Sequence, residues 1–326
     1  MRQKILVTGG GGYVGRTLVR KLYAQGHEVR VLDALRFGVG RFSAEDLSHI
    51  KLEQADLRDS KAVAAVVQGF APDVIVHLAA VHYIPECEAD PETAIATNVL
   101  GTTNLLTAAI PGTRFVFASS GAVYKPDSAL HDEVTSAIEP SDVYGFTKLH
   151  GEHLVGHFAR SRGLAAAVVR LFNVVGPGET NPHLLPEIVA QLKAGQSVVK
   201  LGNMWPKRDY IHVEDAAAGF MAVATTGVVK PGDVVTVNLG TSKQYSVEEI
   251  LTRLRDVSGA PFTFEEDPTR VRAVDRAFLG ANITRIGELF GWKPEKTIDD
   301  AVADLWRAPD MTAGLMAKYK LGVEAA

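Results

Sequence analysis

The chain has 326 residues, of which 46% are hydrophobic and 22% are charged, a composition typical of a globular protein with one or two domains. Its 34 Lys and Arg residues against 38 Asp and Glu residues give a net charge of −4, which argues against nucleic acid as a partner. The longest apolar runs fall well short of the ~20 residues of a membrane span, and no secretory signal pattern opens the chain, so we expect a cytoplasmic protein without a membrane segment.

Short β-branched segments alternate with segments of helical periodicity through the first half of the chain. Several of the expected strands are apolar on both faces, as parallel strands are when helices cover both sides of a sheet. This alternation predicts an α/β fold of the Rossmann type, with a doubly wound parallel sheet. The expected strands cover residues 4–8, 28–32, 50–53, 73–78, 114–118 and 166–171.

The composition changes after residue 172, where a Gly- and Pro-rich loop precedes an expected helix over 186–194 and a strand over 197–201. Another strand, over 234–239, is expected to return to the main sheet. We therefore predict a Rossmann domain over residues 1–172 with a return around 210–240. A smaller mixed α/β substrate domain is predicted from residues 173–209 and 241–326.

A glycine-rich turn joins the first expected strand to a helix that is expected to begin at Arg16. Its glycines fit both Gly-x-Gly-x-x-Gly and Gly-x-x-Gly-x-x-Gly spacing. Glycine is needed there because the main chain must turn tightly and approach a pyrophosphate, which the amino end of the helix also attracts. We expect a dinucleotide to bind at this turn, formed by Gly9, Gly12, Tyr13, Val14 and Gly15.

Two carboxylates follow expected strands at the same edge of the sheet. Asp33 ends the second strand, where a carboxylate accepts hydrogen bonds from the adenosine ribose hydroxyls and repels a 2′-phosphate. It favours NAD, and the nearby Arg36 keeps NADP as an alternative. Asp56 follows the third strand and is either an acceptor for the adenine amino group or a surface residue of a loop.

Tyr144 and Lys148 are four residues apart, which places them on one face of an expected helix. A nearby ammonium stabilises a phenolate and lowers the pKa of the tyrosine, so that it can act as a base. This spacing occurs by chance on surface helices as well. It gains weight from Ser119 and Ser120 at the end of an expected strand, where their hydroxyls could bind the reacting oxygen.

The ordered set of these motifs resembles the extended short-chain dehydrogenase/reductase family, and within it the NAD-dependent nucleotide-sugar epimerases and dehydratases. The resemblance implies that Ser120 is the catalytic serine, that Tyr144 transfers the proton and that Lys148 holds the nicotinamide ribose. The matching segments span nearly the whole chain, at residues 8–15, 33, 56–57, 77–80, 98–102, 119–124, 144–148, 170–177, 208–213 and 291–294.

The same resemblance implies further binding residues. Asn98 would support the site from a neighbouring helix, and His82 would face the sugar. The additional NAD contacts implied are Leu57, Leu78, Ala79, Ala80, Ser119 and Phe172. The implied contacts of the nucleotide-sugar diphosphate and its nucleoside are Asn173, His183, Leu184, Lys200, Leu201, Arg208, Arg272 and Asp275.

Departures from the family pattern bear on the reaction. The related dehydratases carry Asp-Glu after the catalytic residue, whereas Gly121 and Ala122 follow Ser120 here. We therefore expect an NAD-dependent epimerase acting at C4 of a nucleotide-diphosphate sugar, with UDP-hexose favoured, through a transient 4-keto intermediate. The alternatives are an NAD(P)-dependent 4-ketoreductase or dehydrogenase, a dehydratase, and a non-catalytic NAD-binding regulator. The family also implies a homodimer built on the helices that carry Asn98 and Tyr144.

The remaining polar features favour structural roles. His150, His153 and His157 share a helix face, but no acidic partner is evident and hydride chemistry needs no metal, so we expect none. The single cysteine, Cys87, excludes an internal disulfide and fits a reducing compartment. Asp215 is expected to cap the helix that begins beside it.

Overall fold

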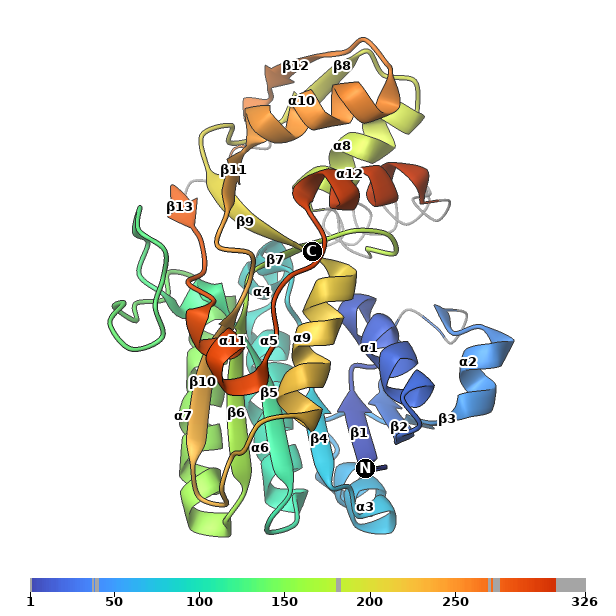
Figure 1. The fold of residues 1–326 in the computed structure, drawn as a ribbon, viewed down its shortest axis with the longest axis vertical. Coiled ribbons are helices and arrows are strands. Elements are labelled where there is room, and N and C mark those ends of the chain that lie inside the picture. The colour runs from blue at the N-terminus through green and yellow to red at the C-terminus, as the bar shows by residue number, and fades with distance from the viewer. Residues whose placement is uncertain are drawn as a thin grey trace.

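A seven-stranded parallel sheet forms the lower part of the molecule (Figure 1). The structure is a computed structural model that describes residues 2–36, 38, 41–179, 183–268, 271 and 276–308. The strand order β10-β6-β5-β4-β1-β2-β3 places the first strand near the middle of the sheet, as a doubly wound fold requires. The strands are β1 (Lys4–Thr8), β2 (Glu28–Asp33), β3 (Ile50–Gln54), β4 (Val74–His77), β5 (Arg114–Ser120), β6 (Ala165–Leu171) and β10 (Val234–Leu239).

Helices cover both faces of this sheet because its strands are apolar on both sides. Along β1, Ile5 and Val7 point into one core and Leu6 into the other. The first core is closed by α1 (Tyr13–Ala24), α9 (Val213–Thr225) and α11 (Thr284–Phe290). The second is closed by α3 (Ser60–Phe70), α6 (Gly101–Ala108) and α7 (Val143–Arg162).

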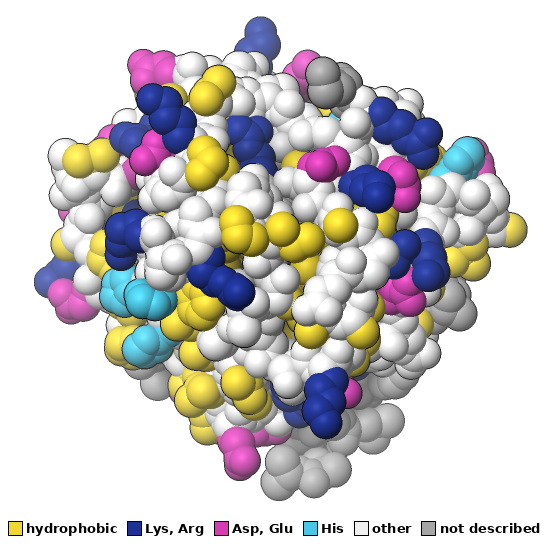
Figure 2. All heavy atoms as spheres, turned by 90° about the horizontal axis from the view of Figure 1, so that it is seen from below, with side chains coloured by type: hydrophobic (Ala, Val, Ile, Leu, Met, Phe, Trp, Pro, Cys, Tyr) yellow, Lys and Arg dark blue, Asp and Glu magenta, His cyan; other side chains and the backbone are white. Residues whose placement is uncertain are grey.

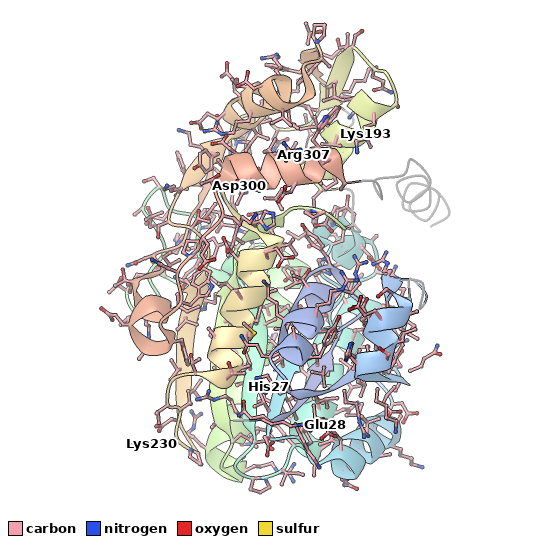
Figure 3. The ribbon with its side chains drawn as sticks, turned by 45° about the vertical axis from the view of Figure 1, so that its right-hand side comes forward. His27, Glu28, Lys193, Lys230, Asp300 and Arg307 are labelled. Atoms are coloured by element: carbon pink, nitrogen blue, oxygen red, sulfur yellow. The ribbon has the colours of Figure 1, made fainter. Side chains whose placement is uncertain are left out.

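The upper lobe has its own apolar core and two small sheets (Figure 1). Its helices are α8 (Leu184–Lys193), α10 (Val247–Ser258) and α12 (Ile298–Arg307), and a parallel pair joins β8 (Val198–Leu201) to β12 (Thr263–Glu266). Figure 3 shows Asp300 and Arg307 at the two ends of α12, far from His27 and Glu28 at the start of β2. A four-stranded sheet links the two parts through β7 (Asn173–Val175), β9 (Lys207–His212), β11 (Gln244–Ser246) and β13 (Phe278–Leu279).

Short elements complete the wall of the main sheet. Among them, a π-helical segment, η2 (Ala96–Leu100), continues from α5 into α6 and buries Asn98. The others are α2 (Ala44–His49), α4 (Ile84–Ala89), α5 (Pro91–Ile95) and the 3₁₀ turn η3 (Gly121–Val123).

The expected strand over 234–239 returns to the main sheet, where β10 pairs in parallel with β6. Two expectations differ from the structure. Residues 284–292 were placed in the substrate domain, but Ile286, Phe290 and Trp292 pack in the first core of the large sheet, because the apolar face of α11 covers β10. Asp215 does not cap α9: its carboxylate accepts from the backbone N–H groups of Glu295 and Lys296 at 3.0 and 2.8 Å, and His212 is the cap.

Within the described part of the chain, no helix is both long enough and apolar enough to cross a membrane. Figure 2 shows the end of the molecule opposite the upper lobe, where acidic, basic and apolar side chains are interspersed. This face therefore presents no field of a single sign.

Candidate active site

The glycine-rich turn after β1 forms a cradle that side chains would fill. Gly9 has a φ of +70°, and a Cβ there would lie 2.6 Å from the backbone nitrogen of Ala79. A Cβ at Gly15 would lie 2.2 Å from the carbonyl oxygen of Gly9. The turn thus keeps the start of α1 open to a ligand's phosphates, which helix amino ends attract.

The carboxylate of Asp33 is held rigidly beside this cradle. Its Oδ2 accepts from the N–H of Gly11 at 2.9 Å, and its Oδ1 accepts from the N–H of Leu35 at 2.8 Å. Both oxygens retain lone pairs for a ribose diol. Asp56 instead forms a bidentate pair with Arg58, at 2.7 to 3.1 Å, which lowers the pKa of its carboxyl.

A cavity of about 1330 Å³ runs along the carboxyl ends of the strands and up to β9. The structure brings most of the predicted site residues to its wall. These are Gly9, Gly12, Tyr13, Val14, Gly15, Asp33, Asp56, Leu57, Leu78, Ala79, Ala80, His82, Ser119, Ser120, Tyr144, Lys148, Phe172, Asn173, His183, Leu184 and Arg208.

Among the described residues, three predicted site residues are not on that wall: Lys200, Leu201 and the buried Asn98. Lys200 and Leu201 lie in β8, where the side chain of Gln191 bonds to both the N–H and the carbonyl of Lys200 and Leu201 packs in the upper core. The resemblance implied that these two residues contact the nucleotide sugar, but neither lies on the cavity wall, and the Lys200 backbone is already bonded to Gln191 of α8. Arg272 and Asp275 fall outside the described residues.

Asn98 is the buried support. Its side chain bonds to both the N–H and the carbonyl of Val81 at 2.8 Å, and its amide nitrogen donates to the Thr147 hydroxyl at 3.0 Å. Asn98 therefore ties the loop after β4 to the helix that carries Tyr144.

Ser120, Tyr144 and Lys148 converge at one point of the cavity. Ser120 is the last residue of β5, and its hydroxyl accepts from the N–H of Ala122 at 3.1 Å. Lys148 lies one turn farther along α7, with its amine 5.7 Å from the centre of the Tyr144 ring. That amine donates to the carbonyl of Ala118 at 2.8 Å.

Burial shifts the pKa values of Tyr144 and Lys148 in opposite directions. It raises the pKa of Tyr144 well above its ordinary value, and the neighbouring Ser120 hydroxyl partly offsets this rise. It lowers the pKa of Lys148 to about 8. The phenol is thus kept as a proton carrier beside an amine whose charge favours the phenolate.

Sequence reasoning missed a buried network behind the trio. Arg170 forms a bidentate ion pair with Glu152, at 2.9 and 2.7 Å, and donates to the Tyr124 phenol at 2.9 Å. The Ser119 hydroxyl donates to Glu152 at 2.5 Å, so its proton is already used within this network. No short spacing in the sequence indicates this network, because Arg170 and Glu152 are 18 residues apart on different elements.

The described residues contain no group of three or more His, Cys, Asp or Glu side chains arranged to hold a metal ion.

A model of the NAD dependent epimerase/dehydratase family matches residues 5–240. The chain belongs to this family. It is an NAD-dependent enzyme, and the open glycine cradle beside the fixed Asp33 carboxylate fits that cofactor.

The curated and solved relatives cover nearly the whole chain. The UDP-glucose 4-epimerase of Streptomyces lividans is 32% identical over 325 residues, which is 94% of this chain and 96% of that protein. The dTDP-glucose 4,6-dehydratase 1 of Escherichia coli is 29% identical over 330 residues, or 92% of this chain and 90% of that one. A crystal structure of the UDP-glucose 4-epimerase from Stenotrophomonas maltophila, with bound NAD and formylated UDP-arabinopyranose, matches with a TM-score of 0.82. It is 27% identical and covers 98% of this chain and 100% of that chain.

Proposed function

We propose that this family member is an epimerase that inverts C4 of a nucleotide-diphosphate sugar, with a UDP-hexose as substrate. The observation that carries the proposal is the placement of Ser120, Tyr144 and Lys148 on one cavity that extends to Arg208. A guanidinium binds a diphosphate through paired hydrogen bonds, so a sugar held by its diphosphate near Arg208 can reach the trio. The similarity to UDP-glucose 4-epimerases supports the choice of sugar nucleotide.

Each side chain of the trio has one task in this reaction. Tyr144 removes the proton of the C4 hydroxyl and later returns it, and Ser120 holds the C4 oxygen through the changes of bonding. Lys148 favours the phenolate form of Tyr144 through its charge. NAD held at the glycine turn beside Asp33 would supply the reversible hydride acceptor that oxidation and reduction at C4 require.

The residues around Ser120 favour epimerisation over elimination of water. Loss of water from a hexose needs an additional acid and base, and the turn after Ser120 offers Gly121 and Ala122. A Cβ at Gly121 would lie 3.1 Å from the Phe172 ring, so a larger side chain at this position would require that ring to shift. The chain is 29% identical to a dehydratase, but it lacks the Asp-Glu pair that the family resemblance places after the catalytic residue of dehydratases.

Incubation of the purified protein with UDP-, dTDP- and GDP-hexoses and hexuronic acids, followed by proton NMR and by absorbance of reduced cofactor, tests the proposal. We expect a C4 epimer of a UDP-sugar without stoichiometric NADH. Accumulating NADH, or turnover only when a ketosugar and NAD(P)H are supplied, would instead establish a dehydrogenase or ketoreductase. A 4-keto-6-deoxy product would establish a dehydratase.

We also propose that the enzyme acts as a cytoplasmic homodimer. The support for the dimer is apolar exposure on adjoining elements, with Ile95, Leu100 and Phe146 about half exposed on α5, η2 and α7. The support for the compartment is the single, buried Cys87, which suits reducing conditions.

A further inference from the structure

Arg276 connects the substrate side of the cavity to both segments that carry the catalytic hydroxyls. Its side chain is nearly buried, and its Nη2 donates to the carbonyl of Ala122 at 3.1 Å and to the carboxylate of Asp142 at 2.7 Å. Ala122 belongs to the turn after Ser120, and Asp142 is the residue before α7. One guanidinium therefore bridges the end of β5 and the start of α7.

Both acceptors are themselves bonded to the catalytic segments. The N–H of Ala122 donates to the Ser120 hydroxyl at 3.1 Å. Asp142 caps α7, with its Oδ1 accepting from the N–H of Gly145 at 2.7 Å, and Tyr144 lies between Asp142 and the next helical turn. A shift of Arg276 would thus alter the separation of the Ser120 and Tyr144 hydroxyls.

On its other side, Arg276 is tied to the strand that carries Arg208. The residue after it, Ala277, accepts at its carbonyl from the N–H of Lys207 at 2.8 Å. The short strand β13 then pairs in parallel with β9, and its register sets Leu279 opposite Arg208. Arg276 also lies on the cavity wall.

We propose that Arg276, acting through Asp142, is a positioning residue that sets the geometry of Ser120 and Tyr144 for proton transfer. The inference rests on the proposed function. An ion pair whose side chains are both about nine-tenths buried fixes two segments more firmly than a surface pair does, since water competes little for it. Because misplacement of reacting groups by about 1 Å can cost ~100-fold in rate, the pair acts on turnover rather than on substrate affinity.

The test compares Arg276→Gln and Asp142→Asn with the native enzyme. Asp142→Asn keeps a carbonyl oxygen for the cap of α7 but removes the carboxylate that receives the guanidinium. For each variant we expect kcat to fall by about 10- to 100-fold while KM changes less than about threefold. The double variant is expected to be no slower than either single variant, because both remove the same interaction. Arg276→Lys is expected to recover part of kcat, since an ammonium can reach one of the two acceptors.

Arg253→Gln is the matched control, since it removes another arginine–aspartate pair, with Asp299 at 3.0 Å, from the upper lobe and off the cavity wall. It is expected to leave kcat unchanged. The inference is overturned if Arg276→Gln keeps kcat within threefold, if its whole loss appears in KM, or if the effects of the two single variants multiply in the double variant. A native enzyme that epimerises no UDP-sugar would instead refute the proposed function.

Discussion

The amine of Lys148 and the phenol of Tyr144 lie together in a buried site. Burial favours the neutral form of both groups, because it lowers the pKa of the amine and raises that of the phenol. A proton can then be exchanged with a bound substrate without leaving a charge uncompensated in a poorly solvated cavity. The hydroxyl of Tyr144 can both remove and return a proton of the substrate when its phenolate is favoured by the charge of Lys148.

Replacement of Tyr144 by Phe removes only that hydroxyl. We expect kcat to fall by about 10²- to 10⁴-fold, the range of a lost general acid–base group, while bound NAD is retained. Steady-state kinetics and the cofactor content of the purified protein measure both effects. Tyr23→Phe is the matched control, because Tyr23 lies on α1 off the cavity wall and its phenol donates to Asp46 of α2. Full activity in Tyr144→Phe would refute the catalytic assignment.

His77 is another residue whose protonation the fold controls. Its ring nitrogens are bonded to the hydroxyls of Thr8 and Thr102 at 2.7 and 2.9 Å, and burial lowers its pKa to about 3. An unfolded histidine binds a proton below about pH 6.5, whereas the folded protein does not bind one there until about pH 3. The unfolded state therefore holds more protons in this window, and stability falls as the pH is lowered through it.

We therefore expect the free energy of unfolding of the native protein to drop more steeply than that of His77→Gln between pH 6.5 and 4.5. The difference in slope should approach about 1.4 kcal/mol for each pH unit. Urea denaturation at several pH values measures it, and other titrating groups cancel in the comparison. Parallel curves for the two proteins would show that His77 does not titrate on unfolding.

At the scale of elements, the end of β5 is fixed from α7 at two successive residues. Lys148 donates to the carbonyl of Ala118, and Glu152 accepts from the hydroxyl of Ser119. The ion pair of Glu152 with Arg170, nearly buried on both sides, joins β6 to the same arrangement. Strand, helix and neighbouring strand are thus held in register next to Ser120.

Glu152→Gln leaves the Arg170 guanidinium buried without its charged partner. We expect the free energy of unfolding to fall by about 3–5 kcal/mol, the cost of breaking a buried ion pair from one side. Glu139→Gln provides the comparison, because its pair with Lys125 is largely exposed and should be worth about 0–1 kcal/mol. Denaturant unfolding of both variants decides the point, and similar losses would mean that burial adds nothing to the Glu152 pair.

Elements and contacts that depend on neighbouring residues in the chain could be predicted from the sequence. Those that depend on residues far along the chain could not. The strands of the main sheet were found because parallel strands are apolar on both faces, and β10 was correctly returned to the sheet. The role of Asp215 was wrong, since a segment 80 residues farther along the chain supplies the N–H groups that it accepts from. The predicted contact of Lys200 with the nucleotide sugar failed to anticipate the fold in the same way, because only the structure shows that the Gln191 side chain is hydrogen-bonded to the Lys200 backbone.

The candidate site divides in the same way. The glycine turn, Asp33 and the trio of Ser120, Tyr144 and Lys148 are motifs with short fixed spacings, and the structure brings all of them to one cavity. The supports of that site, such as Arg170 and Arg276, come from other strands and loops. A contact between residues 134 positions apart, such as Asp142 and Arg276, cannot be predicted from any spacing in the sequence.

At the scale of the whole molecule, the cavity is shared between the main sheet and the segments of the upper lobe, and the proposed dimer surface lies elsewhere, on α5, η2 and α7. Phe146 on α7 and Leu100 on η2 expose 51% and 49% of their surface. We expect light scattering to give the mass of a dimer for the native protein and that of a monomer for a Leu100→Glu variant, because the charge would be buried without a partner. A native monomer would contradict the proposed dimer without touching the assignment of the cavity.

The central claim is that one substrate carbon, C4, loses and regains the same hydrogen inside this cavity. The most direct measurement is turnover of a UDP-hexose deuterated at C4, followed by NMR of the epimer. The account predicts that the deuterium remains at C4 with inverted configuration and that no NADH accumulates. Exchange of that position with solvent hydrogen, or epimerisation at another carbon, would contradict it.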